Sequence, residues 1–186
     1  MNQRGLVERA RQGEHDAFAD LLDVRLARLD AAARLILRDG ELARDAVQET
    51  MIRAWRDLPG LRDPERFDAW LHRLLVNACL DLVRRRKRRV IEVELTAIDA
   101  PAAHDVAGAL ADRQLLDQAL AGLAPGHRAV VALHYLLGMP LPVVAASLGI
   151  PIGTAKSRLH YALAAMRISV TAEPDTAPAT VAGGLA

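Results

Sequence analysis

The stretch that decides the fold is residues 141–159, LPVVAASLGIPIGTAKSRL, which has the form of a helix-turn-helix. Ala145 is small enough to let two helices cross closely, and Gly149 tolerates the positive φ that a tight turn requires. We expect Ile150 to fill the core beneath this turn. The apolar positions expected to hold the second helix against its partner are Ile152, Ala155 and Leu159.

The opposite face of that second helix is polar and almost free of acidic residues. Hydroxyl, ammonium, guanidinium and imidazole groups at these positions can contact phosphates and base edges in a major groove. A helical hairpin with a solvated face is the alternative interpretation. The candidate DNA-contacting residues are Thr154, Lys156, Ser157, Arg158, His160 and Tyr161.

The rest of the chain is also predicted to be helical. Apolar residues recur with a period near 3.6, and no alternating run typical of a strand occurs. The fold class is therefore all-α. In the segment about Glu41 to Asp57 we expect Val47, Met51, Ile52 and Trp55 to be buried. The other predicted helices are about Leu6–Arg11, Asp16–Leu37, Pro64–Arg88, Gln114–Leu123 and His127–Leu137.

The chain is organised as two small helical domains joined by a flexible linker. It has 186 residues, 52% of them apolar, which is enough for one large or two small globular domains. Periodicity weakens where Ala, Asp and Pro accumulate, which is typical of a linker. The predicted boundaries are residues 1–90 for the first domain, 91–112 for the linker, 113–168 for the second domain and 169–186 for a disordered tail.

A formal net charge of +1 hides a concentrated basic run, RRRKRR at residues 84–89, which carries six positive charges in six positions. Residues 114–168 hold four basic residues against one acid, Asp117. Such clusters are expected of nucleic-acid binding, although a six-residue run is also common in solvated tails and linkers. At the end of its helix, the run is expected to interact favourably with the helix dipole.

Cysteine usage and the N-terminus indicate a cytoplasmic protein. Cys79 is the single cysteine, so no intramolecular disulfide can form, and its apolar position predicts a buried thiol. Residues 1–14 contain no apolar segment of the kind a signal peptide needs. Residues 129–155 lack charges and are long enough to span a bilayer, but three prolines and three glycines argue against a membrane helix.

No constellation of residues predicts an enzyme. The sequence contains no Gly-rich phosphate loop, nucleophile elbow or paired catalytic carboxylates. The six histidines are scattered without metal-ligand spacing, so neither a metal nor a cofactor is predicted. A small-molecule substrate is not expected.

Several motifs, in order and at their spacing, resemble an extracytoplasmic-function sigma factor of bacterial RNA polymerase, the minimal group that keeps only regions 2 and 4. Residues 45–55, DAVQETMIRAW, are similar to region 2.2. Residues 67–77, FDAWLHRLLVN, followed by DLVRR at 81–85, are similar to regions 2.3 and 2.4. LAPGHR at 123–128 and GTAKSRL at 153–159 resemble region 4.

An acidic stripe in the first domain suits a basic protein partner. Glu41, Asp45 and Glu49 are spaced by four residues, so a helix places them on one face beside Gln48. Without the resemblance, this stripe reads more simply as a solvated helix face. The resemblance implies that the partner is the clamp-helix coiled coil of the polymerase largest subunit.

The resemblance also implies two DNA sites. Residues 58–66 correspond to the loop that receives an unstacked base of the minus-10 element, and such capture needs a polar pocket and phosphate contacts. The polar face of residues 153–161 corresponds to the minus-35 reader, with Tyr161 where many relatives have a basic residue. An anti-sigma factor is the partner expected to regulate both domains. The candidate minus-10 residues are Arg62, Arg66, Phe67, Asn77, Arg84 and Arg85.

Two other functions remain open on the sequence. A stand-alone helix-turn-helix repressor or activator would bind a palindromic site as a dimer, but it leaves the acidic stripe and the basic run unexplained. A helical adaptor would use the same surfaces without opening a promoter. The function expected from the resemblance is promoter-specific initiation of transcription together with core RNA polymerase.

Overall fold

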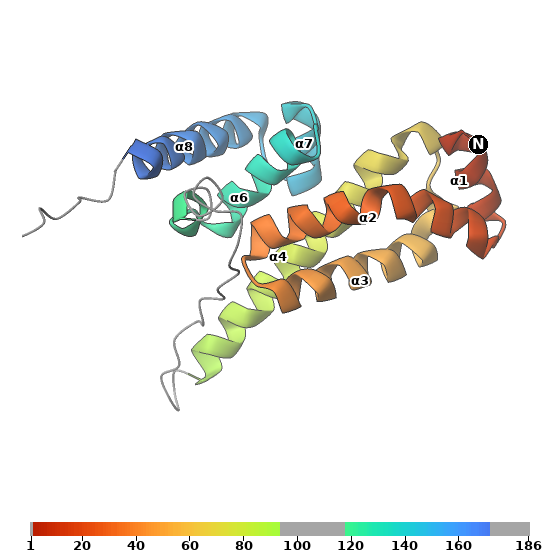
Figure 1. Cartoon of the computed structure of the whole chain (residues 1–186), viewed down its shortest axis with the longest axis horizontal. Helices are drawn as coiled ribbons and strands as arrows, with labels where there is room; N and C mark the ends of the chain where they lie inside the picture. Colours follow the sequence, from red (N-terminus) through yellow and green to blue (C-terminus); the bar gives the residue numbers. More distant parts are fainter. Residues whose placement is uncertain (1, 94–117, 172–186) are drawn as a thin grey trace, which may run out of the picture.

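The computed structural model describes residues 2–93 and 118–171, and all regular elements in these ranges are helical (Figure 1). This confirms the all-α prediction. The expectations for residues 94–117, which cover most of the predicted linker, and for 172–186, which cover most of the predicted tail, lie outside the described residues.

The first domain is built on three long helices, with a short helix across one end (Figure 1). Asn2 caps the first helix through its side chain, so this helix begins earlier than predicted. Arg38 adopts a left-handed conformation with φ of 56° and ends the second helix, and the Asp39 carboxylate caps the third. The elements are α1 (Gln3–Arg11), α2 (His15–Leu37), α3 (Gly40–Asp57), η1 (Leu58–Gly60), η2 (Pro64–Arg66) and α4 (Phe67–Val93).

The second domain contains the predicted helix-turn-helix. Gly149 ends its first helix with φ of 64°, which confirms the requirement for a positive φ in this turn. Ala145 and Ala155 are buried between the helices, as expected. The elements are a helical segment at 118–121, α6 (Pro125–Val131), the π-helical turn η3 (Ala132–Leu136), α7 (Leu141–Leu148) and α8 (Ile152–Thr171).

The two domains pack against each other through one continuous apolar cluster. Residues of α6, η3 and α7 share this cluster with α2 and α4, and Figure 1 shows α6 and α7 lying along these helices. Arg128 is 7% exposed and donates from Nε to the Ile36 carbonyl at 2.8 Å, across the domain boundary. Its Nη1 donates to the Leu123 carbonyl within its own domain. Arg28 adds a second bond across the boundary, to the Leu136 carbonyl at 2.7 Å.

Three local predictions are wrong. Ile52 is 55% exposed rather than buried, because it lies two residues from both Thr50 and Ala54 and therefore points about 160° away from these buried positions. Ile152 is 45% exposed, because burial along α8 begins at Ala155. The helix that carries the basic run continues to Val93, so the run does not occupy its last turn.

The uncharged segment 129–155 is divided among α6, η3, α7 and the start of α8. No helix in the described parts of the chain combines the length and apolar character needed to cross a membrane.

Candidate functional site

The acidic stripe, comprising Glu41, Asp45, Gln48 and Glu49, lies on the exposed face of α3, as its spacing predicts. Two of its three carboxylates are already paired within α3, Glu41 with Arg44 and Glu49 with Arg53. Among the described residues, none makes an ion pair with Asp45. Asp45 is therefore the stripe carboxylate whose charge is not offset by an ion pair within the described residues.

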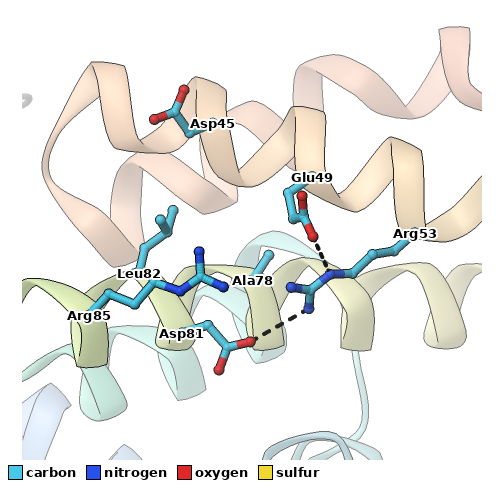
Figure 2. A pocket seen from close by; sticks show the side chains of 7 residues that line it. All are labelled: Asp45, Glu49, Arg53, Ala78, Asp81, Leu82 and Arg85. Carbon is cyan, nitrogen blue, oxygen red and sulfur yellow. Dashed lines mark hydrogen bonds and ion pairs between the residues drawn. The ribbon is translucent and has the colours of Figure 1, made fainter.

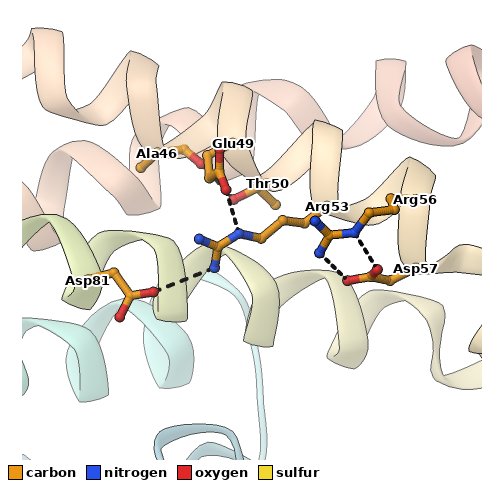
Figure 3. Close-up of polar contacts among 7 residues, drawn as sticks. All are labelled: Ala46, Glu49, Thr50, Arg53, Arg56, Asp57 and Asp81. Atoms are coloured by element: carbon orange, nitrogen blue, oxygen red, sulfur yellow. Dashed lines mark hydrogen bonds and ion pairs between the residues drawn. The ribbon is translucent and has the colours of Figure 1, made fainter.

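Arg53, which is not among the residues predicted from the sequence, connects the acidic stripe to α4. Its Nε donates to Glu49 at 2.6 Å, and its Nη1 lies 3.5 Å from Asp81 of α4 (Figure 3). The Arg53 side chain is 22% exposed, so the bridge is partly shielded from water. The spacing of Glu49 and Arg53 by four residues was the available signal. Thr50, on the buried side of α3, donates to the Ala46 carbonyl at 2.6 Å.

A pocket of about 220 Å³ lies between α3 and α4 beside this bridge. Figure 2 shows the Arg85 guanidinium reaching into the gap between the two helices while Asp45 points away from the Arg53 bridge. Charges of both signs thus meet here, two candidate core-binding carboxylates on one wall and one candidate DNA-binding arginine on the other. The pocket is lined by Asp45, Glu49, Arg53, Ala78, Asp81, Leu82 and Arg85.

The loop at residues 58–66 is held by its apolar ends and exposes its arginines. Leu58 and Leu61 are buried at 0% and 8% exposure, whereas Arg62 and Arg66 are exposed. The Asp63 carboxylate caps η2 by accepting from the Glu65 amide at 3.1 Å and also pairs with Arg66 at 3.2 Å. The loop therefore combines a fixed backbone with two cations facing water.

One face of α4 aligns polar and basic side chains over a long distance. Arg73, Asn77, Arg84 and Arg88 fall within a stripe about 60° wide and about 22 Å long on the helix. The three arginines are exposed and Asn77 is half-buried. Arg84 pairs with Asp81 at 2.7 Å, a weak surface contact that an approaching phosphate can replace. Arg73 was missed because it precedes the basic run, although its helical phase matches Asn77.

Phe67 lies in the core and not on a surface. It is fully buried as the first residue of α4, and the Arg25 guanidinium lies 5.3 Å from its ring centre. A fully buried ring offers no face to a DNA base, so we leave Phe67 out of the DNA surface. Trp70 is half-buried and packs against the core.

The second helix of the helix-turn-helix presents most of its candidate residues to solvent. Lys156, Ser157, His160 and Tyr161 are exposed, and Thr154 is half-buried. Ser157 donates to the Thr154 carbonyl at 3.1 Å, which occupies the hydroxyl hydrogen but leaves its oxygen free to accept. Within this row of residues, Lys156 offers an exposed positive charge.

Arg158 is folded back toward α6. It is half-buried, and a Cβ built on Gly126 would lie 3.2 Å from its Nη1, so a side chain at position 126 would have to displace the Arg158 guanidinium. The centres of the Tyr161 and His127 rings lie 4.9 Å apart, so Tyr161 also packs against the start of α6. Burial, reinforced by Arg158, lowers the pKa of His127. Gly126 and His127 therefore pack against the second helix of the helix-turn-helix, a contact that sequence spacing alone does not reveal.

Cys79 is a core thiol, as predicted. It is fully buried, and burial raises its pKa to about 12, which keeps it protonated at neutral pH. In the described ranges 2–93 and 118–171, no group of three or more His, Cys, Asp or Glu side chains is arranged to hold a metal ion.

Two family models match the chain. Sigma-70 region 2 matches residues 23–89, and Sigma-70 region 4 matches residues 113–166. The ECF RNA polymerase sigma factor SigL of Mycobacterium tuberculosis is 35% identical over 167 residues, covering 88% of this chain and 94% of SigL. SigW of Bacillus subtilis, also an ECF sigma factor, is 25% identical over 173 residues, 87% of this chain and 92% of SigW.

Solved structures show the same two-domain fold. The sigma factor RpoE, in complex with the anti-sigma factor NepR from Bartonella quintana, superposes with a TM-score of 0.71 at 27% identity, covering 84% of this chain and 98% of RpoE. CnrH, in complex with the cytosolic domain of CnrY, gives a TM-score of 0.65 at 29% identity, covering 92% of this chain and 99% of CnrH.

The fold and its surfaces thus define a transcription-initiation protein with sigma-70 regions 2 and 4. The chain belongs to the ECF family of RNA polymerase sigma factors, whose members are regulatory DNA-recognition proteins. The stand-alone helix-turn-helix regulator is not favoured.

Proposed function

We propose that this sigma factor uses three separate surfaces to direct initiation. The acidic stripe of α3 binds core RNA polymerase, with Asp45 at its centre as the carboxylate that forms no ion pair with any described residue. The two other surfaces, on α4 and on α8, bind promoter DNA. The observation that carries this division is the exposure of polar and charged side chains on all three surfaces, outside the apolar cluster that the two domains share.

The minus-10 surface comprises the loop at 58–66 and the polar face of α4. We propose that Arg62 and Arg66 border the position of an unstacked base, while Asn77 and Arg84 hold the strand that follows. Arg85 contributes from the adjacent pocket, and Arg73 extends the same stripe. Phosphate contacts of this kind position the strand, and a polar pocket reads the base.

The minus-35 surface is the exposed face of α8. Lys156, Ser157, His160 and Tyr161 are available for contacts in the major groove, with Thr154 at their edge. Arg158 is held against Gly126 and is proposed to contact a phosphate near the start of α6. The exposed Ile152, one turn before Lys156, suits the methyl group of a thymine.

The proposed function includes regulation by an anti-sigma factor. RpoE, which has the same fold, is solved in complex with such a protein. An anti-sigma factor that covers the acidic stripe or α8 would block a surface needed for initiation. We propose that the chain acts in the cytoplasm, without catalysis, cofactor or small-molecule substrate.

Run-off transcription with purified bacterial core polymerase, on the promoter of this protein's own operon, tests the proposal. The matched pair of variants is Lys156→Ala/Arg158→Ala on α8 and Arg11→Ala/Arg34→Ala on exposed parts of α1 and α2. We expect a transcript that depends on the chain and that falls at least about tenfold in the α8 variant only, since two phosphate or base contacts are lost. Equal transcription from both variants would exclude α8 as the minus-35 reader.

A further inference from the structure

The Arg25 side chain joins three helices at the end of the first domain where the 58–66 loop lies. Its Nε donates to Asp68 of α4 at 2.5 Å, and its Nη1 to the Leu21 carbonyl of α2 at 2.6 Å. Its Nη2 donates to the Gln3 Oε1 of α1, also at 2.6 Å. The Arg25 side chain is only 17% exposed, so the donor of these charge-assisted bonds is largely shielded from water, whereas the Asp68 side chain is 51% exposed.

Gln3 links Arg25 to the 58–66 loop. Its Nε2 donates to the Pro64 carbonyl at 3.1 Å, while its Oε1 accepts from Arg25. One partner is a donor and the other an acceptor, so together they fix the orientation of the amide. Pro64 begins η2, the turn that presents Arg66. A side chain of α1 therefore sets the position of a backbone carbonyl in the middle of the loop.

The same guanidinium also fixes the end of the loop. It lies 5.3 Å from the ring centre of Phe67, the buried residue where the loop enters α4. A cation over an aromatic face is attracted to it, most strongly when both are shielded from water. At the other end, the buried side chains of Leu58 and Leu61 hold the loop to the core. The loop backbone is thus held at both ends and at Pro64, while Arg62 remains exposed.

This arrangement matters because loop order affects the free energy of binding. A loop that is already fixed does not lose conformational entropy when it receives a base. We propose that Gln3 and Arg25 are positioning residues for minus-10 recognition, holding the 58–66 loop in the conformation that receives the unstacked base. The inference rests on the proposed role of this loop, and neither residue needs to touch DNA.

The matched pair of variants for the test is Gln3→Ala and Gln12→Ala. Gln3 and Gln12 lie near opposite ends of α1, and Gln12 is exposed. Holoenzyme assembled from core polymerase and the full chain is titrated with promoter probes whose minus-10 segment is single-stranded. Each probe carries a different non-template base at one position. The base-discrimination ratio is the Kd of the weakest-binding probe divided by the Kd of the tightest-binding probe. The affinities for core polymerase and for minus-35 duplex are measured alongside it.

We expect Gln3→Ala to reduce the base-discrimination ratio about fivefold, because a mismatch in a well-formed site is discriminated by about that factor or more. Core affinity and minus-35 affinity should stay within about twofold. Hydrogen exchange in residues 61–66 should rise in the same variant. Arg25→Lys keeps the charge but lacks the fork that reaches three acceptors, so it should have the same effect. Gln12→Ala should match the unaltered chain.

An unchanged discrimination ratio in Gln3→Ala and Arg25→Lys would overturn the inference. A parallel loss of core affinity and discrimination would also overturn it, since that pattern reports general destabilisation. Failure of the proposed function is distinguishable from both, because the unaltered chain would then show no base discrimination at any minus-10 position.

Discussion

Asp45 is the residue at which the proposed polymerase surface can be tested with least disturbance to the fold. It is exposed, and its neighbours in the stripe already have partners within α3. We expect Asp45→Lys to weaken binding to core polymerase about tenfold or more. A lysine facing a basic partner costs up to several kcal/mol of binding free energy, and about 1.4 kcal/mol corresponds to a tenfold change in Kd. The measurement is a fluorescence titration of labelled chain with core. Asp23→Lys, exposed on α2, is the control, and an equal loss in both variants would contradict the assignment.

His72 makes the stability of the protein depend on pH. Burial, reinforced by Arg28 and Arg25 and opposed by Asp68, lowers its pKa from 6.5 to about 4. Its Nδ1 is buried and has no hydrogen-bond partner within the described structure. Between these two pH values the unfolded chain binds a proton that the folded chain does not, so stability is lost as the pH falls.

We expect the free energy of unfolding to fall by about 2 kcal/mol more in the unaltered chain than in His72→Gln between pH 7 and pH 5. Urea unfolding at the two pH values measures both. The variant retains His127, whose pKa is also lowered by burial, so the difference between the two proteins isolates His72. An identical loss in the two proteins would show that His72 is not buried in its neutral form.

At the scale of elements, the turn between α7 and α8 offers a matched pair of glycines. Gly149 has φ of 64°, and Gly153, in the first turn of α8, has open space where a Cβ would lie. Gly149→Ala should cost about 1 kcal/mol of stability, because a side chain disfavours the left-handed conformation. Gly153→Ala should stabilise by about 0.5 kcal/mol through helix propensity. Thermal unfolding measures both, and a stabilising Gly149→Ala would contradict the assigned turn.

Elements were predictable where a single residue determines the backbone. Gly149 marks its turn by conformational freedom, and the turn lies where the sequence predicts it. The exposure of Ile52 was predicted wrongly, because an apolar residue on the outer face of α3 looks like a core residue in sequence. The bridge from Arg53 to Asp81 requires two helices to be aligned, which no spacing within one helix reports.

At the scale of the whole molecule, a buried arginine contributes to the contact between the two domains. Arg128 donates to carbonyls of both domains, and burial lowers its pKa to about 10, at which it still carries its charge at neutral pH. Arg128→Ala leaves the Ile36 and Leu123 carbonyls without this donor and should cost about 3 kcal/mol. We expect hydrogen exchange at the end of α2 and in α6 to rise together.

Arg28→Ala is the control for this prediction. Arg28 is exposed and also bonds across the domain boundary, so its loss should cost less than about 1 kcal/mol. Urea unfolding compares the two variants. Equal and small losses would mean that apolar packing alone holds the domains together.

The contact between the domains was not predictable from the sequence. The apolar periodicity in residues 1–90 and that in residues 113–168 each predict a separate helical domain. Neither pattern indicates a contact with the other domain. The shared cluster depends on Val130 and Leu133 meeting apolar positions of α2 and α4 that lie far away in the chain. The individual DNA-binding candidates were easier to propose, since exposure on α8 follows from its helical phase.

We propose that one chain reads two promoter elements within a single polymerase complex. Photo-crosslinking residues in place of Lys156 and of Arg62 test it directly in the holoenzyme bound to promoter DNA. We expect the Lys156 position to crosslink to minus-35 duplex and the Arg62 position to the non-template strand of the minus-10 element. Both crosslinks should form only in the presence of core polymerase and from one copy of the chain. Crosslinks from Lys156 to two symmetric half-sites without polymerase, and none from Arg62, would contradict it.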